Sequence, residues 1–169
     1  MIGLVCRPPL RRGHVSDIPP KPEPVRFRFP VEWGKCREFS LALLDADPAQ
    51  AASTAGDAPP ESLLMPATMP VCASRYSPDG LSPIGRMIEA GQVDRRRLLQ
   101  GELEFDFVRP VYSGEVLTVT EELADIYDKT TSKGVLRFFE FRTSYHAADG
   151  ELVCTVRTTN IERRSSQNG

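Results

Sequence analysis

RLLQGELEFDFVRPVYSGEVLTVT, Arg97 to Thr120, is the stretch of sequence that decides the fold. Three acidic residues alternate there with three apolar ones, which are Leu103, Phe105 and Phe107. This two-residue period is typical of a β-strand with one buried face and one wet face. Arg109-Pro110 interrupts the strand because proline has no N–H to donate. Ser113-Gly114-Glu115 then predicts a reversal, after which a second strand begins at Val116.

Helices and a short strand are predicted before this block. Val25 to Val31 has the alternation of an edge strand, and Lys35 to Asp45 has roughly helical apolar spacing. Ser82 suits the N-cap of a second short helix, with Pro83 in its first turn and Gly91 at its end. Leu63 to Ala73 is apolar but interrupted by prolines, so we expect an irregular or short extended segment there.

Two further strands are predicted after the block. Val135 to His146 and Glu151 to Ile161 flank Ala148-Asp149-Gly150, which is a strong hairpin signal. The sum is one or two short helices and four antiparallel strands of about ten residues, arranged as a hairpin meander. The residues alone therefore predict an α+β fold with a single sheet.

Size and composition exclude several classes of protein. The chain has 169 residues, enough for one domain, and a net charge of -2, which gives no electrostatic case for nucleic acid. No apolar run reaches the ~20 residues of a membrane span. The four cysteines have neither zinc-site spacing nor a disulfide-scaffold pattern, so we expect free thiols, no metal and a soluble cytoplasmic protein.

Three regions are expected along the chain. Residues 1–25 are rich in proline and predict an irregular N-terminal extension, residues 26–163 form the domain, and residues 164–169 form a polar tail.

The block QGELEFDFVRPVYSGEVL resembles the MaoC-like hydratase/dehydratase family, in particular the N-terminal half of its double hotdog members. Gln100 stands where that family has His, and Glu115 where it has Asp. Phe27 to Pro48 is similar to the family's opening strand and first helix, and Thr68-Met69-Pro70 sits where it often has Thr-Phe-Pro. The resemblance covers about residues 26 to 163.

This resemblance implies a hotdog fold, in which a curved antiparallel sheet wraps around a central helix, here the short helix Ser82 to Ala90. It also implies (R)-specific hydration of an enoyl thioester, or dehydration of a 3-hydroxyacyl thioester, carried by CoA or acyl carrier protein and without a cofactor. A sheet with so few helices leaves apolar surface and an open edge. We therefore expect a dimer, with the acyl groove near Leu81 to Ala90 and the loop Asp45 to Pro60.

Catalytic members of that family carry Asp-x-Asn-Pro-Ile/Leu-His after the first helix. The matching residues here are Asp45, Asp47 and Gln50, so the Asp is kept and the His is replaced by Gln, which cannot exchange a proton near neutral pH. Three hypotheses follow. The chain is the acyl-binding half of a hydratase that needs a motif-bearing hotdog partner, a self-sufficient homodimer using Asp45 and Asp47, or a non-catalytic acyl-thioester binding module.

Other candidate residues are fewer. Met65, Met69, Met87 and Phe107 have side chains that suit an acyl chain, although each also suits an ordinary core. Arg95, Arg96 and Arg97 form the densest basic run, which favours a solvated surface over a site for carrier phosphates. His14, His146 and Glu89 are poor candidates for a base, since each is placed at a loop, a strand end or a helix end.

Overall fold

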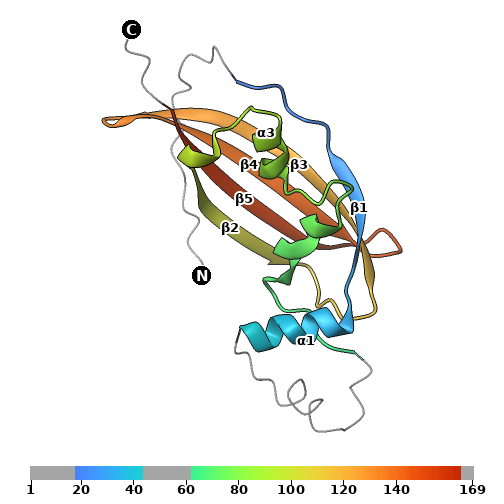
Figure 1. Cartoon of the computed structure of the whole chain (residues 1–169). Helices are drawn as coiled ribbons and strands as arrows, with labels where there is room; N and C mark the ends of the chain where they lie inside the picture. Colours follow the sequence, from blue (N-terminus) through green and yellow to red (C-terminus); the bar gives the residue numbers. More distant parts are fainter. Residues whose placement is uncertain (1–17, 44–61, 165–169) are drawn as a thin grey trace, which may run out of the picture.

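The computed structural model describes residues 18–43 and 62–164, in which five antiparallel strands form one curved sheet (Figure 1). The elements in chain order are β1 (Val25–Pro30), α1 (Trp33–Ala42), the 3₁₀ helix η1 (Met69–Tyr76), α3 (Pro83–Glu89), the 3₁₀ helix η2 (Arg95–Arg97), β2 (Leu98–Phe107), β3 (Val116–Thr131), β4 (Gly134–His146) and β5 (Leu152–Arg164). In Figure 1, α3 and η1 lie over one face of the sheet and α1 lies beyond one end of the strands.

The strand order β1-β3-β4-β5-β2 corrects the predicted meander. β2 and β3 are consecutive in the chain but do not pair. β2 pairs with β5, with Leu103 opposite Thr158, whereas β3 lies between β1 and β4. The reversal at Ser113 to Glu115 therefore carries the chain from one edge of the sheet toward the other instead of closing a hairpin.

Two apolar clusters fill the space between the sheet and the helices that cover one of its faces. The larger cluster joins β1, α1 and η1 to the sheet, and it includes Phe29, Leu117, Val119 and Tyr145, all at most 2% exposed. The smaller one places Met87 of α3 on Leu123, Ile126, Phe139 and Phe141. β4 alternates, and Phe139, Phe141, Thr143 and Tyr145 all face the helices and are buried.

The helices differ from the predictions mainly in their ends. α1 begins two residues before the expected Lys35 and ends at Ala42. α3 is confirmed, with the Ser82 hydroxyl accepting a hydrogen bond from the Gly85 N–H at 3.2 Å. The segment Leu63 to Ala73, expected to be irregular or extended, ends in the first residues of η1. Pro70 occupies a first-turn position of this 3₁₀ helix, where its missing N–H costs nothing.

Arg109 of the Arg-Pro motif forms hydrogen bonds that hold the connection between β2 and β3 in place. Arg109 donates to both carboxylate oxygens of Glu115, at 2.9 and 3.2 Å, and its Nε lies 3.2 Å from Glu151. Burial opposes ionisation of Glu115, but hydrogen bonds from Arg109 and from the Tyr112 N–H lower its pKa. Gly114 has φ +97°, which explains the glycine in the motif. The motif is therefore structural.

The β4–β5 hairpin is confirmed, with Gly150 at φ +91° in the turn. β5 continues past Ile161, where the predicted strand ended, because Arg163 and Arg164 pair with Leu136 and Val135 of β4. Cys36, Cys72 and Cys154 are free thiols, and Cys6 lies outside the described residues. Within the described ranges, no helix is long and apolar enough to cross a membrane.

Candidate functional site

A groove lies on the curved face of the sheet, between η1, the start of α3 and strands β2 to β5, and encloses about 230 Å³. Its apolar walls are Pro70, Val71, Pro83, Ile84, Leu103, Phe141, Tyr145 and Val156. Its polar lining consists of Ser74, Ser82, Gln100, Glu121, Thr143, Thr158 and Asn160. Leu103 is 37% exposed although it faces the core side of β2, because the groove opens beside it at the edge of the sheet.

A charged network, buried at Glu121 and exposed at Asp79, holds the side of the groove formed by α3 and η1. Arg86 of α3 lies 2.8 Å from Glu121 of β3 and 2.8 Å from Asp79, while the Ser74 hydroxyl donates to Glu121 at 2.6 Å. Hydrogen bonds from the Arg86 guanidinium and the Leu81 N–H hold the pKa of Asp79 well below its ordinary value. Both oxygens of Glu121 are thus hydrogen-bonded, and its carboxylate holds η1 and α3 to β3.

Tyr145 forms part of the floor and is 2% exposed. Burial raises the pKa of its phenol well above the ordinary value, and the hydroxyl donates to the Pro70 carbonyl at 2.7 Å. The phenol therefore stays neutral and ties η1 to β4. It is a poor proton donor for chemistry in the groove.

A second depression continues from the groove along α3. It shares Val71, Ser74, Ser82 and Ile84 with the groove and reaches Arg95. Arg96 and Arg97 follow on the surface, each with Nε 3.5 Å from an oxygen of Asp94. Of the three arginines, Arg95 therefore lines the end of this hollow, and Arg96 and Arg97 lie next to it in the sequence.

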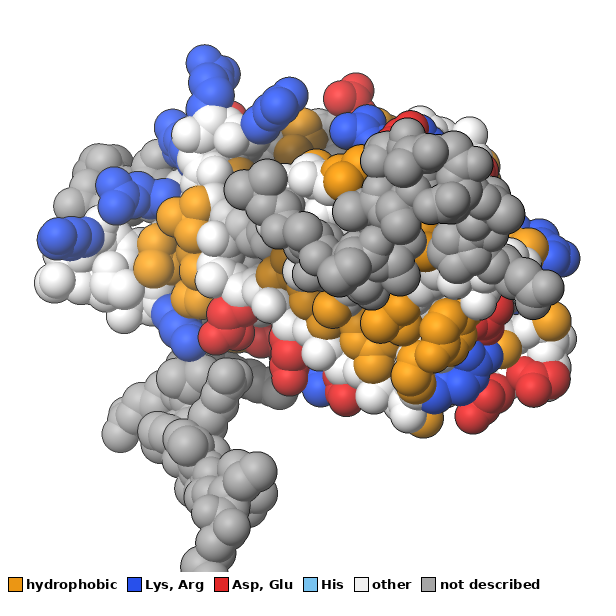
Figure 2. All heavy atoms as spheres, turned by 90° about the horizontal axis from the view of Figure 1, so that it is seen from below, with side chains coloured by type: hydrophobic (Ala, Val, Ile, Leu, Met, Phe, Trp, Pro, Cys, Tyr) orange, Lys and Arg blue, Asp and Glu red, His pale blue; other side chains and the backbone are white. Residues whose placement is uncertain are grey.

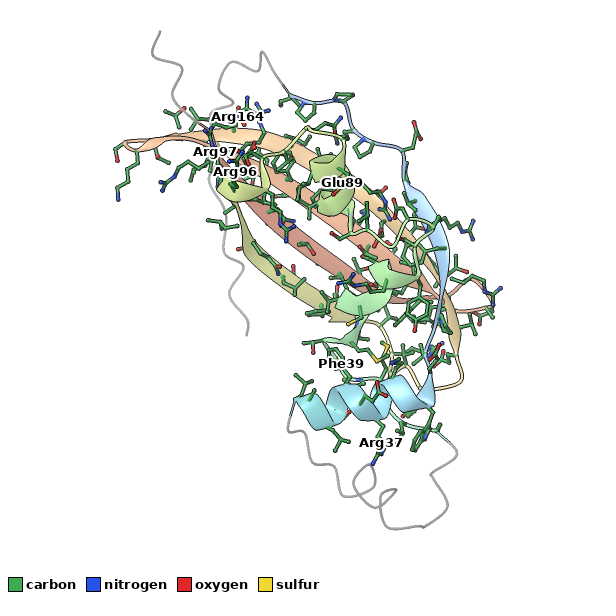
Figure 3. The ribbon with its side chains drawn as sticks, viewed as in Figure 1. Arg37, Phe39, Glu89, Arg96, Arg97 and Arg164 are labelled. Carbon is green, nitrogen blue, oxygen red and sulfur yellow. The ribbon has the colours of Figure 1, made fainter. Side chains whose placement is uncertain are left out.

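Other basic side chains join these arginines. η2 contacts β5, and Arg96, Arg97 and Arg164 lie together at the end of the sheet in Figure 3. Seen from below, Lys and Arg side chains gather at the same left-hand end of the molecule (Figure 2). The hollow thus passes from an end lined by Arg95 and Glu89 to the apolar wall formed by Val156 and Tyr145.

The structure brings only some of the predicted site residues to the groove. Asp45, Asp47 and Gln50, like His14, lie outside the described residues. Met65, Met69 and Met87 are at most 3% exposed and pack in the core, and the groove lining described above contains none of them. Phe107 is half-buried against the same core.

The remaining candidates lie on the surface or at strand ends. His146 is half-buried at the end of β4, where it pairs with Leu152, and Glu89 is exposed at the end of α3. In residues 18–43 and 62–164, no group of three His, Cys, Asp or Glu side chains could hold a metal ion. The groove lining described here combines apolar and polar side chains, and its single carboxylate is held by Arg86.

Sequence reasoning missed Arg86 and Glu121, although one signal was present. Leu117, Val119, Glu121 and Leu123 alternate along β3 and are all buried, so an acid occupies a position in an otherwise apolar series. Such a break in an apolar alternation indicates a buried charge that needs a partner. Nothing in the local sequence of α3 indicates that Arg86 is this partner.

The sequence matches the family model described as "FAS1-like, dehydratase domain region" over residues 23–156. A UPF0336 protein of Streptomyces griseus is 31% identical over 137 residues, which cover 79% of this chain and 84% of that protein. A UPF0336 protein of Saccharopolyspora erythraea is 27% identical over 166 residues, 94% and 95% of the two chains. The chain belongs to the family of FAS1-like dehydratase domains.

Solved structures give the same fold. A C-terminally truncated HadBC (3R-hydroxyacyl-ACP dehydratase) complex of Mycobacterium tuberculosis is similar with a TM-score of 0.58 and 23% identity, covering 82% of this chain and 94% of that one. The ChsH1-ChsH2 complex of the same organism has a TM-score of 0.60 and 20% identity, with 86% and 90% covered. The fold is the hotdog fold of the MaoC-like dehydratases, as the sequence resemblance predicted.

Proposed function

We propose that this chain is the acyl-binding subunit of an (R)-specific enoyl-thioester hydratase or 3-hydroxyacyl-thioester dehydratase, and that a second hotdog subunit supplies the catalytic Asp and His. The observation that carries the proposal is the groove itself. Its walls suit an acyl chain, while the described lining holds one carboxylate, Glu121, already bound by Arg86 and Ser74. Gln50 in place of the family's His points the same way.

The position of the groove at the edge of the sheet supports the need for a partner. It opens beside β2, whose outer edge pairs with no other described strand. A second hotdog joined at this edge would extend the sheet and close the groove. HadBC and ChsH1-ChsH2 are solved as complexes, which favours a heteromer for this chain as well.

The arginine end of the hollow suits the carrier of the acyl group. CoA and the phosphopantetheine arm of acyl carrier protein both bring phosphate, and Arg95, Arg96 and Arg97 offer guanidinium groups that can bind it. The ordering of charge along the hollow therefore matches an acyl thioester, with phosphate at one end and an alkyl chain at the other.

The test is reconstitution. The chain is purified alone and with a candidate hotdog partner that carries the complete Asp and His motif, and hydration of a short enoyl-CoA is followed. We expect turnover in the mixture only. Full activity of the chain alone would overturn the subunit proposal.

The second candidate is a self-sufficient homodimer, favoured by the match of Asp45 to the family's Asp. Two nearby carboxylates can separate their pKa values and share acid and base roles. Asp45→Asn distinguishes the two, since it should abolish turnover in a homodimer and leave a mixed complex nearly as active as before. Tight binding without turnover in any mixture would instead indicate a non-catalytic acyl-thioester binding module.

A further inference from the structure

The groove is closed at one end by Tyr145. Tyr145 of β4 and Val156 of β5 both line it. Cys154, two residues before Val156 on the same face of β5, pairs with Tyr145 in the sheet and is completely buried in the core. The groove therefore ends at the Tyr145 side chain, whereas it opens beside Leu103 at the edge of the sheet and continues along α3 toward Arg95.

A second apolar space, the α1 pocket, lies on the other side of η1. It encloses about 390 Å³ between β1, α1 and η1, and its apolar walls come from Phe29, Phe39, Met69, Cys72 and Tyr76. Figure 3 shows Phe39 on the side of α1 that faces η1. The groove and the α1 pocket have no lining residue in common among those described, so they are separate spaces.

The wall between the groove and the α1 pocket is thin. η1 presents Pro70 to the groove and Cys72 to the α1 pocket. Next to η1, the ring of Tyr145 meets the ring of Phe29 edge to face, with the ring centroids 6.3 Å apart, and Phe29 lines the α1 pocket. The Tyr145 hydroxyl donates to the Pro70 carbonyl at 2.7 Å, which holds the ring in this place. One pair of aromatic rings therefore separates the closed end of the groove from the α1 pocket.

An acyl thioester fits the groove in one direction. Its carrier is charged and must stay in water at one of the open sides, because burying unpaired charge is costly. The free end of the alkyl chain is then the part that reaches the closed end, at Tyr145.

We infer that Tyr145 determines the longest acyl chain that the groove accepts, and that its ring excludes longer chains from the α1 pocket. This inference rests on the proposed function. It assigns to Tyr145 a role in specificity in addition to its attachment of η1 to β4. The chain accepts alkyl groups that end at the ring, although an apolar pocket lies directly behind it.

The experiment measures affinity against acyl chain length. Calorimetry follows the binding of butanoyl-, hexanoyl-, octanoyl-, decanoyl- and dodecanoyl-CoA to the full-length chain, alone and with the motif-bearing partner used for reconstitution. The proteins are the wild type, Tyr145→Ala and two controls. Tyr145→Phe keeps the ring and loses only the hydrogen bond to Pro70. Tyr127→Ala makes the same truncation on the opposite face of the sheet, where Tyr127 stacks on Phe138.

In the wild type, affinity should rise about fourfold for each methylene group buried and stop rising once the chain reaches Tyr145. Tyr145→Ala should move this limit to a longer chain, with about a fourfold gain for each methylene group that enters the α1 pocket. Tyr145→Phe and Tyr127→Ala should keep the wild-type limit.

Truncation of a buried ring destabilises a core, so thermal unfolding is recorded for each variant. Tyr145→Leu, which fills part of the space of the ring, is a second variant at this position and should extend the limit by less than Tyr145→Ala.

Two results would overturn the inference and leave the proposed function standing. One is a wild-type affinity that keeps rising through dodecanoyl-CoA, and the other is a limit that stays in place in folded Tyr145→Ala or Tyr145→Leu. Absence of binding to the wild type at every chain length would overturn the proposed function and this inference with it.

Discussion

At the level of single residues, Glu121 is the side chain on which the groove wall depends. It is 3% exposed and is held by Arg86 and Ser74. Glu121→Ala should lower the free energy of unfolding by about 3 kcal/mol, the low end of the cost of breaking a buried ion pair, because Arg86 keeps its bond to Asp79. Urea unfolding measures the loss. The double variant Arg86→Met/Glu121→Leu should recover part of it, and an unchanged unfolding midpoint for Glu121→Ala would contradict the role assigned to the pair.

Asp79 gives the same network a dependence on pH. Its pKa is lower in the folded protein than the ordinary value of about 3.9, so its carboxylate stabilises the fold above about pH 4. That contribution is lost as the pH falls below about 4 and the group becomes protonated. We expect Asp79→Asn to lower the melting temperature at pH 7 and to differ less from the wild type at pH 3. A gap that stays constant across this range would show that Asp79 is not the group responsible.

The local sequence predicted where strands and turns lie in the chain better than it predicted which strands pair in the sheet. The β4–β5 hairpin follows from Ala148-Asp149-Gly150, because a tight turn and two alternating flanks leave one pairing available. The partner of β2 lies some fifty residues further along the chain, with Phe105 opposite Val156, and no local pattern specifies it. Gly101 lies at a bulge between Gln100 and Glu102, and a Cβ there would lie 2.7 Å from the end of the Ile161 side chain, so this side chain would have to move.

The groove was the hardest feature to predict for the same reason. Its walls come from η1, α3 and four strands, so its composition depends on the strand order. The methionines predicted to line the groove pack in the core instead. The groove lining includes threonines and Asn160, which nothing in the local alternation of their strands marks as groove residues. The basic run Arg95–Arg97 was visible in the sequence, but its place at the end of the hollow was not.

At the level of the elements, α3 is the short central helix that covers the sheet. Seven residues give little intrinsic stability, so its N-cap carries unusual weight. Ser82→Ala removes the acceptor for the Gly85 N–H and should lower the free energy of unfolding by about 1 kcal/mol. Ser82→Asp restores an acceptor and serves as the matched control. Equal losses in chemical denaturation for both variants would indicate that Ser82 acts through packing instead.

At the level of the whole molecule, the two edges of the sheet are unequal. β1 is short, six residues long, whereas β2 presents ten residues along an edge that no described strand covers. Leu99 and Val108, in and just after β2, are 55% and 63% exposed. An edge of this length with apolar side chains is a ready surface for another strand.

We therefore expect the chain to associate through β2, either with a second copy of itself or with another hotdog subunit. The monomer should be the minor species. Light scattering at micromolar concentration measures the mass. Leu99→Lys places a charge at this edge and should shift the population toward monomer, while Leu43→Lys, an equally exposed leucine after α1 at 52%, should leave it unchanged. A folded wild-type monomer that pairs neither with itself nor with a motif-bearing hotdog would refute both the interface and the shared groove. If the two variants dissociate alike, the contact lies elsewhere and the groove would have to close without β2.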